Sequence, residues 1–294
     1  MKIVVTGGAG FIGSSFIHLL DNKGIEYLVV DKLTYAADIN NLPDSSKLLT
    51  KDICDVTEED LGEYDFLVNF AAESHVDNSI ENGKPFIFSN VVGTFNLLEV
   101  ARKNKKLKKF IQISTDEVYG DLYTKKIKSA KETTNLNPSS YYSSTKASAD
   151  LLVESAHITY GLPYLITRTV NNYGIRQHKE KFIPTVIEKV KNNQPIPVYG
   201  DGQHIREWIW VEDNVKFIYD LMISETTGIR NIGSEFRISN MGIISLLSEI
   251  TSKKINVEFV EDRKGHDKRY GLNTLYDQTP KITKSLKQYL KEQI

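Results

Sequence analysis

Two short motifs in this chain carry side chains suited to acid, base and redox chemistry: residues 115–117 read Thr-Asp-Glu, and Tyr142 is followed four positions later by Lys146. Residues four apart lie on one helix face, where an ammonium lowers the pKa of a phenol from about 10 toward neutral pH. The tyrosinate then takes a proton from an alcohol while a nicotinamide takes the hydride. Asp116 and Glu117 suit a second step, loss of water, in which one carboxyl group removes a proton and the other protonates the leaving hydroxyl.

Each motif also has a simpler explanation. An isolated Asp116-Glu117 pair can begin a helical turn and interact with its dipole, and Thr115 can bond local backbone at the end of a strand. A Tyr-x-x-x-Lys motif arises easily by chance in a chain with 15 tyrosines. The positions favour chemistry, because residues 115–117 follow a predicted buried strand and Tyr142 opens a predicted amphipathic helix. Open α/β folds bind ligands at that carboxyl edge of the sheet.

Composition narrows the class of protein. The 294 residues contain 37 Lys and Arg against 38 Asp and Glu, and the lysine-rich run 103–109 fits a solvated helix end, so nucleic-acid binding is disfavoured. Cys54 is the only cysteine, which excludes an intrachain disulfide and fits a reducing compartment. A strand is predicted directly at residues 2–6, and no apolar run approaches the roughly 20 residues of a membrane span. We therefore expect a soluble cytoplasmic protein that binds no nucleic acid and no membrane.

The elements that must hold these residues follow an alternating pattern. Apolar runs at 3–5, 27–30, 66–70, 110–113 and 164–168 are separated by helical patterns, which predicts a doubly wound α/β fold with a parallel sheet covered on both faces. We expect a Rossmann domain at residues 1–173, to which residues 207–224 return. The looser, proline-punctuated pattern of residues 174–294 predicts a smaller lobe that closes over a substrate.

A glycine-rich turn predicts the cofactor. Gly7, Gly10 and Gly13 follow the first strand and open a helix, a spacing that lets backbone approach a pyrophosphate at the helix N-terminus. A ligand-free turn is the alternative, but Asp31 ends the second predicted strand 18 residues after Gly13, where it can accept a bond from a ribose 2′-hydroxyl. Because a carboxylate there repels a 2′-phosphate, NAD is favoured over NADP, although Lys32 offsets part of that repulsion.

Seven stretches resemble a known family. They are TGGAGFIGS (6–14), DKLTYA (31–36), AAESHVD (71–77), STDEVYG (114–120), YSSTKAS (142–148), NNYG (171–174) and IREW (205–208). The chain is similar to the extended short-chain dehydrogenase/reductases, and most of all to the dTDP-glucose 4,6-dehydratases of deoxysugar synthesis. The resemblance runs in order from the first strand to Tyr270. It implies a Rossmann domain, a sugar-nucleotide-binding lobe at residues 174–294 and a tightly bound NAD.

The resemblance implies a role for each catalytic candidate. Tyr142, activated by Lys146, would remove the proton of the sugar C4 hydroxyl as hydride passes to NAD. Thr115 would hydrogen-bond the C4 oxygen as charge develops there. Glu117 would remove the C5 proton and Asp116 would protonate the departing C6 hydroxyl, after which hydride returns to C6. The product would be a 4-keto-6-deoxy sugar.

The same resemblance implies two sets of binding residues, and for several of them the chemistry alone leaves alternatives open. Arg206 suits a phosphate, or pairs with Glu207 at the surface. Asp52 and Ile53 flank an adenine, or begin a helix, and His266 bonds the phosphate or caps a loop. We expect no metal. The implied cofactor set is Gly7, Gly10, Phe11, Ile12, Gly13, Asp31, Lys32, Leu33, Thr34, Asp52, Ile53, Phe70, Ala71, Ala72, Ser74, Ser89, Tyr142, Lys146 and Asn172, and the implied substrate set is Ser74, Thr115, Asn171, Lys181, Phe182, Pro197, Tyr199, Arg206, Asn240, Arg263, His266 and Tyr270.

Other functions remain open. Related epimerases usually carry small residues at the positions of Asp116 and Glu117, so the pair favours a dehydratase. Ile175, Lys264 and Tyr141 stand where the family usually has proline, which keeps UDP-glucose open beside dTDP-glucose. A non-catalytic NAD sensor is the more distant alternative. Family members are usually homodimers through two helices, here expected at residues 91–104 and 142–159, although apolar residues there also suit packing within one chain.

Overall fold

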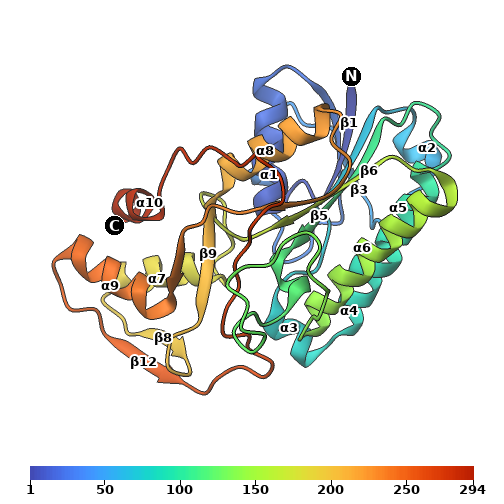
Figure 1. Cartoon of the computed structure of the whole chain (residues 1–294). Helices are drawn as coiled ribbons and strands as arrows, with labels where there is room; N and C mark the ends of the chain where they lie inside the picture. Colours follow the sequence, from blue (N-terminus) through green and yellow to red (C-terminus); the bar gives the residue numbers. More distant parts are fainter.

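The computed structural model describes residues 1–294 and places a seven-stranded sheet at the centre of the larger part of the molecule (Figure 1). Its strands run in the order β10-β6-β5-β4-β1-β2-β3, and every neighbouring pair is parallel. The predicted doubly wound α/β fold is confirmed. The strands are β1 (Lys2–Thr6), β2 (Glu26–Asp31), β3 (Leu48–Thr50), β4 (Phe66–Asn69), β5 (Lys109–Thr115), β6 (Tyr164–Thr169) and β10 (Gly228–Ile232).

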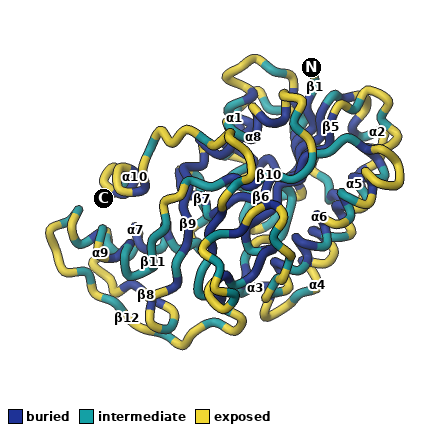
Figure 2. Tube along the Cα trace, in the orientation of Figure 1, coloured by how far each residue is buried: buried dark blue, intermediate teal, exposed yellow.

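Helices cover both faces of this sheet because successive strand residues point to opposite sides. On one face, Ile3 and Val5 of β1 belong to the cluster that contains Phe16 of α1 (Phe11–Asn22) and Ile218 of α8 (Val211–Ile223). On the other face, Val4 belongs to the cluster formed with α5 (Gly93–Ala101) and α6 (Tyr141–Tyr160), which lie side by side in Figure 1. Figure 2 shows the resulting buried centre and the exposed rim of loops.

The smaller lobe has its own sheets and core. A three-stranded sheet joins β11, β9 and β7, and a two-stranded sheet joins β12 and β8. Trp208 and Trp210 of β9 lie in its core together with apolar residues of the lobe helices. The lobe elements are β7 (Asn171–Tyr173), α7 (Phe182–Lys191), β8 (Ile196–Tyr199), β9 (Ile205–Trp210), β11 (Arg237–Ser239), α9 (Asn240–Thr251), β12 (Val257–Val260) and α10 (Leu286–Gln293).

The chain crosses between the two parts more often than the sequence predicts. The strand β7 leaves the first 173 residues for the lobe sheet, and residues 207–210 lie in that sheet rather than in the main one. Helix α8 packs against the main sheet, and β10, which the sequence analysis did not anticipate, forms its edge beside β6. The division at residue 173 therefore stays a prediction.

Short elements complete the chain. None of its helices is long and apolar enough to cross a membrane. The short elements are η1 (Ile39–Asn41), α2 (Glu58–Leu61), α3 (Val76–Glu81), α4 (Lys84–Phe86), the π-helical segment η2 (Ile87–Val92) and η3 (Asp116–Tyr119).

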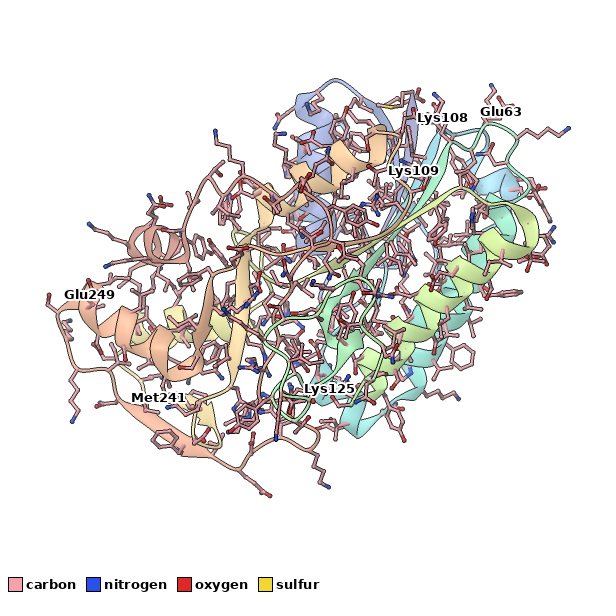
Figure 3. All side chains as sticks on the ribbon, viewed as in Figure 1. Glu63, Lys108, Lys109, Lys125, Met241 and Glu249 are labelled. Atoms are coloured by element: carbon pink, nitrogen blue, oxygen red, sulfur yellow. The ribbon has the colours of Figure 1, made fainter.

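A buried lysine ties α8 to the start of β5. Lys109, labelled in Figure 3, is only 4% exposed and donates to three carbonyl oxygens at the end of α8: Leu221 at 3.3 Å, Met222 at 3.0 Å and Ser224 at 2.8 Å. Carbonyls in the last turn of a helix have no partner within the helix, and a cation there also complements the dipole. Lys109, the last residue of the basic run 103–109, therefore has a structural role, while the neighbouring Lys108 is exposed.

Candidate active site

A cavity of about 900 Å³ lies at the carboxyl edge of the main sheet, between the Rossmann part and the lobe. Its size suits a small-molecule or cofactor site. Of the residues that the sequence analysis assigned to the site, all line this cavity except Leu33, Asp52 and Asp116. Motifs far apart in the chain therefore meet in one place, as expected where parallel strands end together.

The glycine-rich turn brings backbone against backbone at one end of the cavity. Gly7 has φ 70°, and a Cβ on it would lie 2.5 Å from the amide nitrogen of Ala71; a Cβ on Gly13 would overlap the carbonyl oxygen of Gly7. Gly10 precedes α1 without a side-chain cap, so the first amides of this helix face the cavity with no side chain bound to them. These features fit the pyrophosphate of a dinucleotide.

Asp31 is held as an acceptor at the end of β2. Its two carboxylate oxygens accept the amides of Leu33 at 2.9 Å and Ala9 at 3.0 Å. Burial raises the pKa of Asp31, and the two amide bonds oppose that rise. Leu33 does not line the cavity and instead adopts φ 56°, with its amide on Asp31.

Lys32 is partly neutralised by Asp52. The ammonium lies 3.2 Å from a carboxylate oxygen of Asp52, which itself accepts the amide of Cys54. Asp52 does not line the cavity and contacts the site through its ion pair with Lys32, whereas the adjacent Ile53 lines the cavity. The positive charge of Lys32 weakened the case for NAD over NADP, and the carboxylate of Asp52 offsets that charge.

The carboxyl end of β5 carries two carboxyl groups in different environments. Thr115 caps η3 by accepting the amide of Glu117 at 3.2 Å and also bonds Asp116 at 3.3 Å. Burial raises the pKa of Asp116 well above its usual range, and the charges of Glu117 and Glu207 add to the rise. A raised pKa suits Asp116 to the role of general acid.

Glu117 faces the cavity. Burial raises its pKa as well, but the guanidinium groups of Arg263 and Arg206 oppose that rise. A carboxyl group whose pKa is raised by burial and lowered by nearby cations is suited to ionise and act as a base. The two neighbouring side chains therefore differ in proton affinity because one is shut away from the cavity and the other meets cations across it.

Tyr142 and Lys146 lie on one face of α6, as predicted, and both line the cavity. The ammonium donates to the carbonyl oxygen of Ile113 at 2.6 Å. Burial lowers the pKa of Lys146 to about 8, against the opposing charge of Asp150. The helix begins at a capping box between Ser140 and Ser143, which fixes the first turn.

The prediction that the pKa of Tyr142 falls from about 10 toward neutral pH is wrong for this structure. The pKa of the phenol is raised, chiefly by burial and then by the charge of Glu117, and a bond with Thr115 opposes this only in part. Desolvation of the phenolate outweighs the attraction of a cation that is itself desolvated.

Arg206 is not a surface cation. It is 8% exposed, its guanidinium lies 4.4 Å from the centre of the Tyr270 ring, and it donates to the carbonyl oxygens of Ile205 and Asp267. The alternative in which it pairs with Glu207 is wrong, because Glu207 pairs with Arg237 at 2.8 Å. Arg206 therefore keeps a charge at the cavity wall without a carboxylate partner.

Two histidines and an aspartate meet beside the cavity. His266 shares a hydrogen bond with Asp262 at 2.7 Å and stacks on His204, with ring centres 3.6 Å apart and planes 10° from parallel. Burial lowers the pKa of His266 to about 3. Nitrogen lone pairs lie in the ring plane, so those of two stacked rings run parallel instead of converging on one ion. The expectation of no metal stays a prediction.

The sequence analysis missed several charged residues that line the cavity. Glu180 lies 3.7 Å from His75 and 3.6 Å from His178, and its other oxygen accepts the hydroxyl of Tyr35 at 3.3 Å. These residues come from loops, where no periodic pattern marks them. The only sequence signal was position, since the loop 175–181 directly follows the NNYG stretch. Other missed lining residues include Glu73, Asp77, Gln177 and Trp208.

Known proteins are similar to this chain over most of its length. A model described as the NAD dependent epimerase/dehydratase family matches residues 3–233. The low-salt glycan biosynthesis protein Agl12 of Haloferax volcanii is 44% identical over 283 residues, covering 93% of this chain and 90% of that protein. The dTDP-glucose 4,6-dehydratase of Haemophilus influenzae is 40% identical over 304 residues, with coverage of 93% and 90%. The solved dTDP-glucose 4,6-dehydratase DesIV of Streptomyces venezuelae, which has NAD bound, has a TM-score of 0.92 at 35% identity, covering 100% of this chain and 95% of that one.

Proposed function

The chain belongs to the NAD-dependent epimerase/dehydratase family, and we propose that it catalyses the 4,6-dehydration of a nucleotide-activated glucose, most readily dTDP-glucose, with NAD as its cofactor. The product is the 4-keto-6-deoxy sugar nucleotide. The observation that carries this proposal is the pair at the end of β5, a buried Asp116 whose pKa is raised beside a Glu117 that faces the cavity and two arginines. An epimerase has no use for such a pair, because it releases no hydroxyl.

The glycine-rich turn, helix α6 and the lobe contribute different parts of the reaction. NAD, when bound along the glycine-rich turn, supplies the oxidant for C4 and the reductant for C6. Tyr142 removes the C4 hydroxyl proton, and Thr115 stabilises the developing charge on that oxygen. Lys146, held by the Ile113 carbonyl, stabilises the tyrosinate.

Two carboxyl groups then carry out the elimination. Once C4 is a ketone, the C5 proton is acidic and Glu117 removes it. Asp116 gives its proton to the C6 hydroxyl, which leaves as water. Asp116 does not line the cavity, so this step requires the substrate's C6 hydroxyl to reach it past Thr115 and Glu117.

The diphosphate is the natural ligand of the lobe's cations. Arg206, Arg263 and Lys181 line the cavity, and Lys181 donates to the Ser74 carbonyl. Guanidinium groups give bidentate contacts to phosphate. We assign the remaining lobe residues of the cavity, among them Asn240 and Tyr270, to the nucleoside and diphosphate.

We also propose that the enzyme is a homodimer in the cytoplasm that supplies deoxysugar synthesis of the rhamnose type. Support for the dimer comes from exposed apolar side chains on η2, α5 and α6, which pack against one another. They are Ile87, Phe88, Phe95, Leu151 and Ile158. Exposed apolar side chains grouped on neighbouring helices suit contact with a second copy.

The test is incubation of the purified protein with dTDP-glucose and, separately, with UDP-glucose, following product mass and the absorbance of bound cofactor. Loss of one water without net NADH is the expected result, faster with dTDP-glucose. A faster reaction of UDP-glucose would show that the enzyme prefers uracil over thymine as the nucleobase of its substrate. An unchanged mass with a new sugar configuration would make the protein an epimerase, and bound NAD without turnover would make it a sensor.

A further inference from the structure

A side-chain hydrogen bond joins the segments that follow β2 and β4, the two strands on either side of β1. Asn78 of α3 donates its amide to the hydroxyl of Tyr35 at 3.0 Å. The three strands are parallel, so both segments leave the same edge of the sheet. Neighbouring strands lie about 4.8 Å apart, so these two segments start about 10 Å apart. The bond between them therefore spans the end of β1, where the glycine-rich turn begins.

The cavity reaches both sides of this bridge. Ala36, which follows Tyr35, lines the cavity, and so does Asp77, which precedes Asn78 on the opposite side. The glycine-rich turn lies between the two segments, and it is the place for the pyrophosphate of a dinucleotide. The Tyr35–Asn78 bond thus crosses the part of the cavity that suits the cofactor.

The Tyr35 side of the bridge has a fixed base. The amide of Asp38 donates to the carbonyl oxygen of Ala9 at 3.2 Å, and the side chain of Asn41 donates to the same oxygen at 3.0 Å. These bonds tie the segment after β2 to the glycine-rich turn. The bridge therefore opens at its side-chain contacts, not by movement of this segment.

The lobe adds a carboxylate to the bridge. One oxygen of Glu180 accepts the hydroxyl of Tyr35 at 3.3 Å, and the other lies 3.7 Å from Nε2 of His75 and 3.6 Å from Nδ1 of His178. The hydroxyl of Tyr35 thus gives its one hydrogen to Glu180 and accepts from Asn78. Glu180 lines the cavity, but like charges repel, so a carboxylate is no ligand for a pyrophosphate. Its contacts with the protein account for its position.

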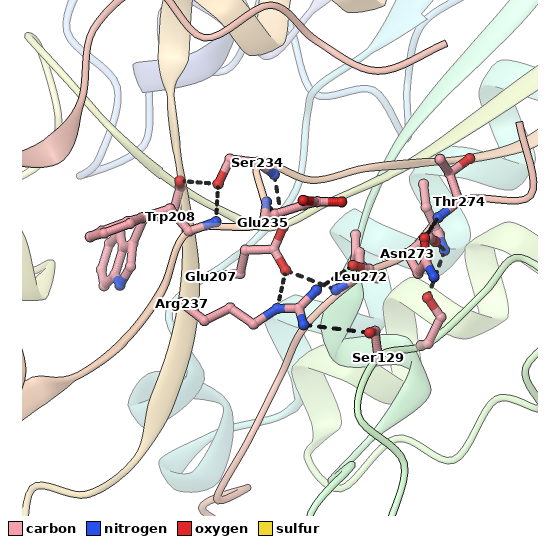
Figure 4. A network of polar contacts seen from close by, with 12 residues as sticks. Ser129, Glu207, Trp208, Ser234, Glu235, Arg237, Leu272, Asn273 and Thr274 are labelled. Atoms are coloured by element: carbon pink, nitrogen blue, oxygen red, sulfur yellow. Dashed lines mark hydrogen bonds and ion pairs between the residues drawn. The ribbon is translucent and has the colours of Figure 1, made fainter. Parts of the chain in front are cut away.

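A carboxylate that only supports the fold has different surroundings. Glu207 of β9 is 0% exposed and accepts four donors at 2.8 Å or 3.0 Å. Figure 4 shows these donors, which are Ser234, Glu235, Arg237 and Leu272. The contacts of Glu180 are longer, and Tyr35 is 52% exposed. Such contacts break at a small cost in free energy, as a bridge that must open requires.

We propose that Tyr35, His75, Asn78 and Glu180 form a strap over the bound dinucleotide, and that NAD enters and leaves only when this strap opens. The inference requires NAD in the cavity and goes beyond the proposed dehydration. The contacts of the strap join protein to protein, so they govern the rates of NAD entry and release and not its affinity. In the proposed reaction, the strap keeps the reduced cofactor in place between the two hydride transfers.

The test measures exchange of the cofactor. The enzyme is loaded with radiolabelled NAD and chased with an excess of unlabelled NAD, and the bound label is followed over time. Tyr35→Phe removes the hydroxyl that bonds Asn78 and Glu180 but keeps the ring. Label should leave this variant about 2- to 10-fold faster than the wild-type protein. The Kd for NAD, measured by titration, should stay within about twofold of the wild-type value, because entry becomes faster as well.

Two further variants examine the bond itself. Tyr123 is 63% exposed, comparable to Tyr35, and lies on another loop, so Tyr123→Phe should exchange NAD at the wild-type rate. Asn78→Ala removes the other end of the Tyr35–Asn78 bond and should also speed release. Because both substitutions remove one shared contact, the double variant should release NAD more slowly than the product of the two single effects predicts.

Three results would overturn the inference. The first is an unchanged release rate in Tyr35→Phe. The second is faster release with a Kd weakened to the same degree, which would place the hydroxyl on the dinucleotide itself. The third is a double variant whose effect equals the product of the single effects. If the wild-type protein loses no water from either sugar nucleotide, the proposed function fails, and the exchange of NAD still decides whether the strap exists.

Discussion

At the scale of single residues, two carboxyl groups that adjoin in sequence are separated by what surrounds them. Asp116 is buried, and the charges of Glu117 and Glu207 add to the rise of its pKa more than Arg206 opposes it, whereas Glu117 meets both Arg263 and Arg206. A group in the first environment holds its proton and a group in the second can give it up. Acid and base are therefore assigned by burial and by the lobe, not by residue type.

Replacing Glu117 by Gln removes the base but leaves the oxidation machinery in place. We expect C4 oxidation to continue slowly, visible as NADH absorbance, while water loss falls by about 10²–10⁴-fold. Single-turnover absorbance together with product mass measures both steps. Dehydration at the wild-type rate would remove Glu117 from this role.

Replacing Tyr142 by Phe removes the proton acceptor of the first step. NADH formation in a single turnover should fall by about 10²-fold or more. Tyr141 is a matched control, because it is adjacent and 63% exposed. Tyr141→Phe should form NADH at the wild-type rate, and equal rates in both variants would contradict the assignment of Tyr142.

Oxidation should also depend on the charge of Lys146. Burial lowers the pKa of this ammonium to about 8, so the proton is present below that pH and is lost as pH rises through it. We expect the NADH-forming rate to decline above about pH 8. Asp150 favours the ammonium, so Asp150→Asn should move the decline to lower pH, while Glu154→Gln on the same helix should not. A flat profile from pH 7 to pH 9 would count against an ammonium role.

At the scale of elements, the motifs near strand ends predicted most of the site. The runs at 3–5, 27–30, 66–70, 110–113 and 164–168 are found as β1, β2, β4, β5 and β6. The strands β3 and β10 were missed because they are short or only partly buried edge strands, whose pairing depends on distant residues. Glu180 and His178 were missed because loop residues carry no period. The raised pKa of Tyr142 could not be predicted, since the degree of burial is a property of the packed structure.

The junction of α8 and β5 gives a prediction about stability. Lys109→Met leaves three carbonyl oxygens of the α8 end without a donor. The free energy of unfolding should fall by about 1–3 kcal/mol. Lys108 is 62% exposed and pairs with Asp65, so Lys108→Met should change it by less than about 0.5 kcal/mol. Urea denaturation of both variants makes the comparison, and equal losses would contradict the capping role of Lys109.

At the scale of the whole molecule, the cavity is closed by polar contacts between the two parts. Arg263 lies 3.5 Å from Asp77, and Tyr199 donates to the same carboxylate at 3.3 Å. Lys181 donates to the Ser74 carbonyl at 3.1 Å. These contacts are partly exposed, so each of them adds little to the stability of the closed arrangement.

The apolar face over α5 and α6 leads to the prediction on assembly. Phe95→Glu places a charge in the proposed dimer contact, where burial without a partner is unfavourable. Light scattering should report a monomer. Phe259, on β12 and similarly exposed at 59% against 53% for Phe95, provides the control. Phe259→Glu should keep the mass of the wild-type protein, and an unchanged mass for Phe95→Glu would place the dimer contact elsewhere.

The order of the site along the chain has a consequence for its synthesis. The cavity residues on the glycine-rich turn, β2, β4 and β5 all precede residue 118, whereas Arg263, His266 and Tyr270 come from near the end of the chain. A ribosome makes the cofactor half first, and domains fold as units from the N-terminus. Helix α8 and the edge strand β10 of that half lie at residues 211–232, so it can fold as a unit only after they have been made. Arg263, His266 and Tyr270 still follow them, and the sugar-binding side of the cavity is therefore the last part to form.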